Sequence, residues 1–162
     1  MIRPLAGIDR CGLIGAMKKT AKKKKKRRIE SRFALRVGRS RTGLGVFADE
    51  PIKHGVRIVE YTGRTLKPGE EYTSRSKYLF EISRTKTIDG TVKSNAARYF
   101  NHSCAPNCRA ENTGRRIYIV SRRRIEPGEE LTYNYGKDYF DQHIRKNGCR
   151  CLKCEPMELV LD

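Results

Sequence analysis

The sequence contains no long apolar run. Hydrophobic residues make up 37% of its 162 residues, and no segment approaches the roughly 18 consecutive apolar residues that a membrane-spanning helix needs. Residues 1–16 include Arg3, Asp9 and Arg10 and lack the sustained apolar stretch of a secretory leader. We therefore expect a protein that has no membrane span and stays inside the cell, under reducing conditions.

Acidic residues are scarce relative to basic ones. The chain has 36 lysines and arginines against 18 aspartates and glutamates, which gives a formal net charge of +18 at pH 7. More than half of this excess lies in residues 1–28, which contain eleven basic residues and one acidic residue. Such a surplus favours polyanionic partners such as nucleic acid, but it does not indicate a fold.

The basic segment at residues 17–28 is dominated by lysine and arginine. Like charges at this density oppose a packed structure, so we expect residues 1–28 to form a basic, disordered tail. The tail could contact nucleic acid, serve as a nuclear address in a eukaryote, or remain solvated without a dedicated partner. The sequence does not separate these functions, and Met17 could also be the start of translation.

Sustained helical periodicity is also scarce. From residue 33 onward, apolar and β-branched residues occur in short runs separated by glycines, which is typical of small antiparallel sheets. The expected strands cover residues 33–37, 45–48, 57–61, 78–82, 87–89 and 116–121. Short helical pieces are expected only within residues 68–76, 95–100 and 137–144. Because a chain of this length buries one modest core, we predict a single, mainly β domain.

Residues 97–108 bring several chemically active side chains together. Asn101 could orient a charged ligand, His102 could donate a hydrogen bond or bind a metal, and Cys104 is a soft metal ligand. The same residue types also occur in buried loops, where they satisfy the local backbone. Residues 97–108 alone do not decide between a functional site and such a loop.

Two further segments favour a functional site. Residues 129–136 place Tyr133 and Tyr135 two positions apart, on one side of the chain if it is extended, and end at Gly136. Residues 149–154 hold three cysteines in a Cys-x-Cys-x2-Cys pattern. In a reducing compartment this pattern indicates a metal site rather than disulfides.

These motifs, in this order, resemble the SET-domain protein lysine methyltransferases. The resemblance rests on Gly43-Leu44-Gly45-Val46-Phe47-Ala48, Glu60-Tyr61-Thr62-Gly63, Tyr78-Leu79-Phe80-Glu81-Ile82, Asn101-His102-Ser103-Cys104, Glu130-Leu131-Thr132-Tyr133-Asn134-Tyr135-Gly136 and Cys149-Arg150-Cys151-Leu152-Lys153-Cys154. It implies a SET domain at residues 29–140 with a pseudo-knotted C-terminal part and few short helices, followed by a post-SET zinc-binding segment at residues 141–162. No cysteine-rich pre-SET cluster precedes the domain.

The resemblance also implies an activity and its residues. It implies a transferase that uses S-adenosyl-L-methionine to methylate lysines of a basic protein, histone or histone-like, mainly to the mono- or dimethyl state. Tyr135 matches the tyrosine that orients the reacting amine, and Tyr61 and Tyr133 belong to the same catalytic site. The implied cofactor-binding residues are Gly43, Leu44, Gly45, Tyr78, Arg98, Asn101 and His102.

The cysteines match a structural zinc site of the family. The implied ligands are Cys104, Cys149, Cys151 and Cys154. The last two are separated by two residues, where the family more often has four, although Cys-x2-Cys is itself common in zinc sites. Within this motif, His102 is implied to contact the cofactor rather than the zinc.

Side chains outside these motifs are expected to serve packing. We expect Cys108 to be a buried core thiol, and Tyr72 or Tyr118 to be a core side chain. Cys11 is expected to be a thiol of the tail.

Two other functions remain open at this point. The chain could be a basic, zinc-containing module that binds nucleic acid or chromatin without catalysis, or a SET fold that binds peptide without turnover. A nuclear histone enzyme and a bacterial cytoplasmic enzyme acting on a basic DNA-associated protein fit the sequence equally well. The sequence identifies neither the substrate protein nor the oligomeric state.

Overall fold

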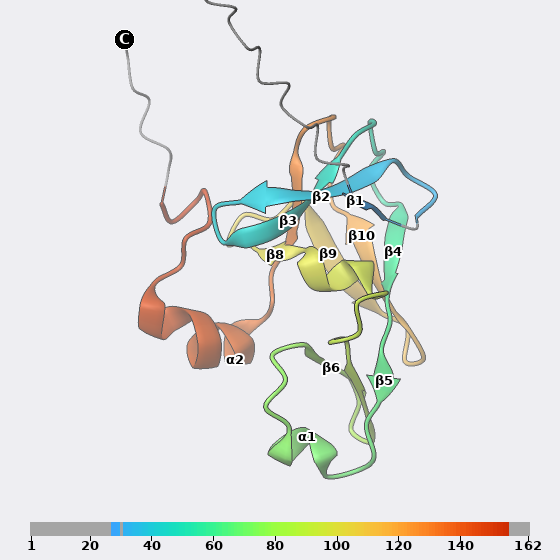
Figure 1. Cartoon of the computed structure of the whole chain (residues 1–162), viewed down its shortest axis with the longest axis vertical. Coiled ribbons are helices and arrows are strands. Elements are labelled where there is room, and N and C mark those ends of the chain that lie inside the picture. The colour runs from blue at the N-terminus through green and yellow to red at the C-terminus, as the bar shows by residue number, and fades with distance from the viewer. Residues whose placement is uncertain (1–26, 30, 156–162) are drawn as a thin grey trace, which may run out of the picture.

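Three small sheets form the described part of the chain (Figure 1). The computed structural model describes residues 27–29 and 31–155. The largest sheet has five strands in the order β1-β2-β3-β11-β8, and the other two have three strands each, β4-β10-β9 and β5-β7-β6. This arrangement confirms the prediction of a mainly β fold with several small sheets.

The strands are short, and all but one pair of neighbours are antiparallel. The five-stranded sheet contains β1 (Arg27–Arg28), β2 (Leu35–Ser40), β3 (Gly43–Ala48), β11 (Glu130–Tyr133) and β8 (Asn101–His102). The second sheet contains β4 (Arg57–Tyr61), β10 (Ile117–Ser121) and β9 (Cys108–Asn112). The third contains β5 (Arg64–Thr65), β7 (Lys86–Asp89) and β6 (Leu79–Ser83).

The helices are short as well. A helix, α1 (Glu70–Thr73), precedes β6, and a 3₁₀ turn (Ala96–Tyr99) precedes β8. After β11, α2 (Lys137–Tyr139) continues as a π-helical turn (Phe140–Ile144) and a 3₁₀ turn (Arg145–Asn147). Within residues 27–29 and 31–155, none of the helices has the length and apolar character that crossing a membrane requires.

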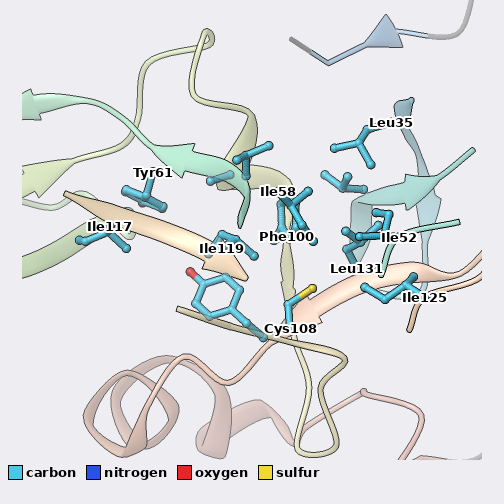
Figure 2. Packing of buried hydrophobic residues seen from close by; sticks show 14 of the residues in the cluster. Leu35, Ile52, Ile58, Tyr61, Phe100, Cys108, Ile117, Ile119, Ile125 and Leu131 are labelled. Atoms are coloured by element: carbon cyan, nitrogen blue, oxygen red, sulfur yellow. The ribbon is translucent and has the colours of Figure 1, made fainter. Parts of the chain in front are cut away.

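One apolar core includes buried residues of all three sheets, and Figure 2 shows part of it. In β10, Ile117 and Ile119 are fully buried while Tyr118 between them is not, which is the alternation expected of a strand with one face on the core. Leu131 of β11 and Phe100 beside β8 pack into the same cluster. Burial of each such side chain contributes roughly 1.5–3 kcal/mol.

Strand β11 lies between β3 and β8 and joins distant parts of the chain. It pairs antiparallel with β3 through Leu131 and Val46, and parallel with β8 through Thr132 and Asn101. The tyrosine-bearing segment therefore lies directly beside residues 101–102, although about thirty positions separate them in sequence. The pseudo-knotted passage of the chain stays a prediction.

Several expectations need correction. Tyr72 is 86% exposed, because α1 is a single turn that buries none of its residues, so the expectation of a core side chain is wrong for Tyr72. Tyr118 is half-buried beneath the Arg57 guanidinium, whose carbon lies 4.5 Å from the ring centroid. Cys108 is fully buried, which confirms its assignment as a core thiol.

The boundary of the tail also differs from the prediction. Arg27 and Arg28 form β1 and pair with Val37 and Arg36 of β2, so they are strand rather than tail. The disorder predicted for residues 1–26 lies outside the described residues, as does Cys11. Strands β5, β8, β9 and β11 were not in the predicted set, because β5 and β8 have two polar residues each and the short strands β9 and β11 mix polar with apolar residues.

Candidate functional site

Two adjacent hollows meet near the rings of Tyr135 and His102. The smaller hollow has a volume of about 300 Å³ and is lined largely by aromatic side chains, including that of Tyr135. The larger, of about 650 Å³, lies between residues 39–42, β8 and residues 150–153, and His102 lines it. The ring centroids of His102 and Tyr135 are 5.4 Å apart, so the two hollows are neighbours.

Tyrosines from two strands form the wall of the smaller hollow. Tyr61 ends β4, Tyr133 ends β11, and Tyr135 follows two residues later. The rings of Tyr133 and Tyr135 lie 4.8 Å apart, because alternate residues of an extended chain point to the same side. Phe80 of β6 packs on Tyr61 with a centroid distance of 5.2 Å. This aromatic wall excludes water and leaves a few polar tips.

The hydroxyl groups of these tyrosines differ in their partners. The Tyr61 hydroxyl donates to Tyr78 O at 2.8 Å, and the Tyr135 hydroxyl donates to Phe100 O at 2.7 Å. Both oxygens keep lone pairs with which to accept a hydrogen bond. Within the described residues, no hydrogen bond involves the Tyr133 hydroxyl, which leaves it open to a ligand in the smaller hollow.

Burial keeps these phenols protonated. Desolvation is the main cause that raises the pKa of Tyr61, Tyr133 and Tyr135 well above the ordinary value, and nearby carboxylates or tyrosines add to it. At neutral pH the hollow is therefore lined by neutral hydroxyls. Phenolate is not available there as a base, so an amine that reacts in this hollow has to lose its proton elsewhere.

We expect Tyr61, Tyr133 and Tyr135 to resist ionisation at high pH. Tyrosines of the unfolded chain ionise near about pH 10, whereas the folded pKa values are higher. As the pH rises, the tyrosines of the unfolded state therefore lose their protons first. The contribution of the three protonated tyrosines to folding stability is complete below about pH 10 and is lost as the pH rises further. Ultraviolet absorbance of phenolate should rise in two stages, the second together with unfolding followed by circular dichroism. Ionisation of all eight tyrosines in one stage with the fold intact would contradict this.

Arg98 presents a buried donor that has no acceptor. Its guanidinium carbon lies 4.5 Å from the Tyr78 ring centroid, and its Nη1 donates to Thr91 O. Its Nε is buried and finds no hydrogen-bond partner within the described residues. Such a buried group destabilises the protein unless a partner binds it. Because Arg98 lines the smaller hollow, its position fits an anionic group of a ligand.

Asn101 and His102 have fixed orientations at the larger hollow. Asn101 Nδ2 donates to Leu44 O at 3.0 Å and to Glu130 Oε1 at 2.7 Å, which leaves its Oδ1 as a free acceptor. His102 Nδ1 accepts from Tyr135 N at 3.2 Å, so the neutral ring carries its proton on Nε2. Burial lowers the His102 pKa, which favours this neutral form.

Four cysteines converge beside the larger hollow. The Sγ atoms of Cys104, Cys149, Cys151 and Cys154 all lie within 4.8 Å of one another. The Cys104 sulfur is 3.8 Å from that of Cys149 and 3.6 Å from that of Cys154. Tetrahedral zinc with Zn–S bonds of about 2.3 Å separates its sulfurs by about 3.8 Å. The cluster can therefore hold one zinc ion with all four positions filled.

The structure divides the predicted cofactor residues between the two hollows. Tyr78 and Arg98 line the smaller one together with the three tyrosines, and Asn101 and His102 line the larger one. Residues 43–45 line neither hollow, but Leu44 O holds the Asn101 amide.

Two further side chains of this site were not predicted from the sequence. Tyr139 lines the smaller hollow and packs edge-on against Tyr135 with a centroid distance of 4.9 Å. Tyr135 precedes the helical piece expected at residues 137–144, so helical spacing does not connect the two rings. Glu130 lines the larger hollow together with Glu129, and the pair of glutamates in the sequence does not indicate that either belongs to a ligand site.

A family model and several known proteins match this chain. A family model described as SET domain matches residues 43–136. Histone-lysine N-methyltransferase 2D of Homo sapiens is 38% identical over an alignment 138 residues long that covers 76% of this chain and 2% of that protein. For histone-lysine N-methyltransferase set-2 of Caenorhabditis elegans the identity is 43% over an alignment of 131 residues, with coverage of 72% of this chain and 8% of that protein. For histone-lysine N-methyltransferase ASHH3 of Arabidopsis thaliana the identity is 40% over an alignment of 126 residues, with coverage of 67% of this chain and 34% of that protein.

The chain therefore spans between 2% and 34% of the length of these three relatives. The family match includes the three tyrosines of the smaller hollow and residues 101–102. It ends before the cysteines at residues 149–154.

Proposed function

This chain belongs to the SET-domain family, and from that membership we propose that it is an S-adenosyl-L-methionine-dependent protein-lysine N-methyltransferase. The observation that carries the proposal is the smaller hollow, where Tyr61, Tyr133 and Tyr135 surround a narrow space next to a larger hollow. All three relatives compared above are named as histone-lysine N-methyltransferases.

The smaller hollow suits a lysine side chain that has lost its proton. A lysine in water has a pKa of about 10.4, so little of it is a free amine at neutral pH. Aromatic walls disfavour the charged ammonium form, because burial removes its hydration. The oxygens of Tyr135 and Tyr61 can accept from the amine N–H groups, which orients the nitrogen lone pair.

The two hollows also fit the cofactor. S-adenosyl-L-methionine supplies a methyl group on a positively charged sulfur, together with a carboxylate, an amino group and a nucleoside. Arg98 Nε can donate a hydrogen bond to an anionic group of the ligand, such as its carboxylate. Asn101 Oδ1 can accept one from a ligand amino or hydroxyl group. The larger hollow, of about 650 Å³, has room for a ligand of this size. We infer that Tyr78, Arg98, Asn101 and His102 hold it.

The charges near the smaller hollow support a basic protein substrate. Glu81 of β6 and Asp138 of α2 both line it and are exposed. The basic residues of the lining are Lys77 and the half-buried Arg98. Within the described residues, neither carboxylate forms an ion pair, so both remain available to basic residues beside the target lysine. We infer a histone or histone-like substrate. We also infer an intracellular location, because the five described cysteines are free thiols, which are typical of a reducing compartment.

Transfer of labelled methyl groups tests this function. The purified chain is incubated with labelled S-adenosyl-L-methionine and a panel of basic proteins, and the modified residue is identified by mass spectrometry. Label on lysine supports the proposal. Salt-sensitive binding of nucleic acid without any transfer would instead favour a non-catalytic basic module.

Removal of the Tyr133 hydroxyl should change how many methyl groups are added. This hydroxyl has no partner in the described residues, so it can hold the amine or a water beside it. Breaking such a hydrogen bond costs about 0.5–1.5 kcal/mol, roughly two- to thirteenfold in the rate of a further transfer. We expect mainly monomethyllysine and some dimethyllysine from the unmutated protein, and more di- and trimethyllysine from Tyr133→Phe. Mass spectra of a peptide at full turnover provide the measurement, and dominant trimethyllysine from the unmutated protein would contradict the expectation.

The basic tail should bind polyanions without contributing to methyl transfer. Deletion of residues 1–26 keeps β1 and removes most of the charge of the tail. We expect weaker binding to duplex DNA and a smaller dependence of that binding on salt, because fewer phosphates are neutralised. Transfer to a short peptide should stay within about twofold. Replacement of the five lysines at 22–26 with glutamine is the matched control for charge, and unchanged DNA binding in both variants would exclude the tail as the contact.

A further inference from the structure

We propose that Glu130 is a positioning residue of the cofactor site, whose carboxylate fixes the Asn101 amide and holds residues 40–45 beside it. The inference rests on the proposed function, since it takes the larger hollow as part of the cofactor site. Glu130 begins β11 and lines this hollow. It forms no ion pair within the described residues, and its carboxylate accepts hydrogen bonds from neutral groups.

Each oxygen of the Glu130 carboxylate binds a different segment. Oε1 accepts from Asn101 Nδ2 at 2.7 Å, and Oε2 accepts from Ser40 Oγ at 2.9 Å. Asn101 belongs to β8 and Ser40 to the end of β2, so one side chain of β11 connects two other strands of the sheet. Hydrogen bonds to a carboxylate are shorter and stronger than neutral ones.

These bonds determine which atom of Asn101 faces the ligand. Both hydrogens of Nδ2 are used, one by Glu130 Oε1 and the other by Leu44 O. Rotation of the amide by a half turn would direct its oxygen at the Glu130 carboxylate, which is repulsive. The acceptor Oδ1 is therefore the atom that remains free for an amino or hydroxyl donor of the ligand.

Gly45 provides the space that the Glu130 carboxylate occupies. A Cβ atom at Gly45 would clash with Glu130 Oε1 and would lie 3.0 Å from both Glu130 Cδ and Ser40 Cβ. Contact of Gly45 with the cofactor stays a prediction, and within this structure its close approach is to Glu130. An alanine at this position would push the carboxylate away from Asn101.

The main chain at Glu130 is itself held in place by a buried side chain. Asn107 is 4% exposed, its Nδ2 donates to Glu130 O at 2.8 Å, and its Oδ1 accepts from Thr132 N at 2.9 Å. The start of β11 is thereby fixed before any ligand binds. Preorganisation of this kind lowers the cost of ordering the site when a ligand binds.

Calorimetric binding of S-adenosyl-L-methionine to the full chain tests the proposal. We expect Glu130→Ala to weaken binding about tenfold to a hundredfold, the range that a hydrogen bond to a charged group supports. Glu130→Gln should recover most of this loss, because its amide oxygen can accept from Asn101 while its nitrogen donates to Ser40 Oγ. Glu126→Gln, an exposed carboxylate of the preceding turn that pairs with Arg124, is the control and should bind as the unmutated protein does.

Two double variants separate positioning from a general structural role. If Glu130 acts through Asn101, the added effect of Glu130→Ala in an Asn101→Ala background should be less than about twofold. If Gly45 provides the space for the Glu130 carboxylate, then Gly45→Ala alone should weaken cofactor binding. In the Glu130→Ala background the same substitution should have little added effect. The proposal would be overturned if the effects of the two substitutions on the binding free energy were fully additive in both pairs and the melting temperatures of the variants were unchanged.

A ligand-free measurement gives an independent result. The side-chain amide of Asn101 should exchange its protons slowly with solvent in the unmutated protein and faster in Glu130→Ala, as observed by nuclear magnetic resonance. Slow exchange in both proteins would overturn the role of Glu130. Absence of cofactor binding by the unmutated protein would instead contradict the proposed function, so the two failures are distinguishable.

Discussion

Replacement of Tyr135 by phenylalanine is expected to lower the rate of methyl transfer on the order of a hundredfold, the cost of misplacing a reacting group by about an ångström. The hydroxyl of Tyr135 donates to Phe100 O at 2.7 Å, which holds the phenol ring and directs its oxygen lone pairs into the smaller hollow. Phenylalanine keeps the ring and its contacts with Tyr133 and Tyr139 but removes the acceptor. The loss should therefore appear in kcat.

Stability and cofactor binding should change little in this variant. Phe100 O loses one donor, which costs about 1 kcal/mol, and the residues at the larger hollow are not altered. Label transfer gives the rate, calorimetry gives the cofactor Kd, and thermal melting gives the stability. Tyr118→Phe removes a hydroxyl from a residue that lines neither hollow and should keep normal turnover. Near-normal turnover of Tyr135→Phe would remove this hydroxyl from the mechanism.

Removal of zinc is expected to have an equally large effect on activity. We propose that Cys104, Cys149, Cys151 and Cys154 bind one zinc ion per chain. Residues 150–153 line the larger hollow, so the zinc would fix one of its walls. The apolar core cluster includes no residue of 149–155. Chelation should therefore abolish most transfer and loosen residues 149–155 without unfolding the sheets.

Elemental analysis and limited proteolysis provide the measurements. We expect one zinc per chain in active protein, loss of the metal in Cys149→Ser, and faster cleavage near residues 149–155 after chelation. Cys108→Ala is the matched control, because Cys108 is fully buried in the core and lies outside the cluster. This control should lose about 1 kcal/mol of stability and keep its zinc. Active protein without zinc would refute the metal site.

The regular parts of the fold were predictable because apolar and β-branched residues occur there in short runs. The strand predicted at residues 57–61 matches β4, in which Ile58, Val59 and Tyr61 are buried. The helical turns near residues 70 and 96 were also located, because polar residues and a preceding proline or asparagine mark them. Tyr133 and Tyr135 could be placed on one side of the chain from their spacing alone.

Contacts between segments that lie far apart along the chain could not be predicted from the sequence. Strand β8 has only two residues, and because both are polar the sequence predicts a loop there. It is a strand only because β11 pairs with it. Glu130 is adjacent to Glu129 in sequence, yet Glu129 pairs with Arg123 while Glu130 binds Asn101. Only the register of β11 between β3 and β8 distinguishes these two carboxylates.

The position of β11 also has a consequence for how the protein is made. Both hydrogen-bonding edges of β11 are used, one by β3 and the other by β8, and these partners are synthesised much earlier than β11 itself. Until β11 emerges from the ribosome, β3 presents an open strand edge and residues 101–102 lack their strand partner, so the nascent chain can pair with other chains and aggregate. Pairing over such sequence distances is slow, so the last step of folding is also the step that joins the tyrosines to residues 101–102. A chain interrupted before β11 would therefore need a chaperone to stay soluble, and the active site would form only at the end of synthesis.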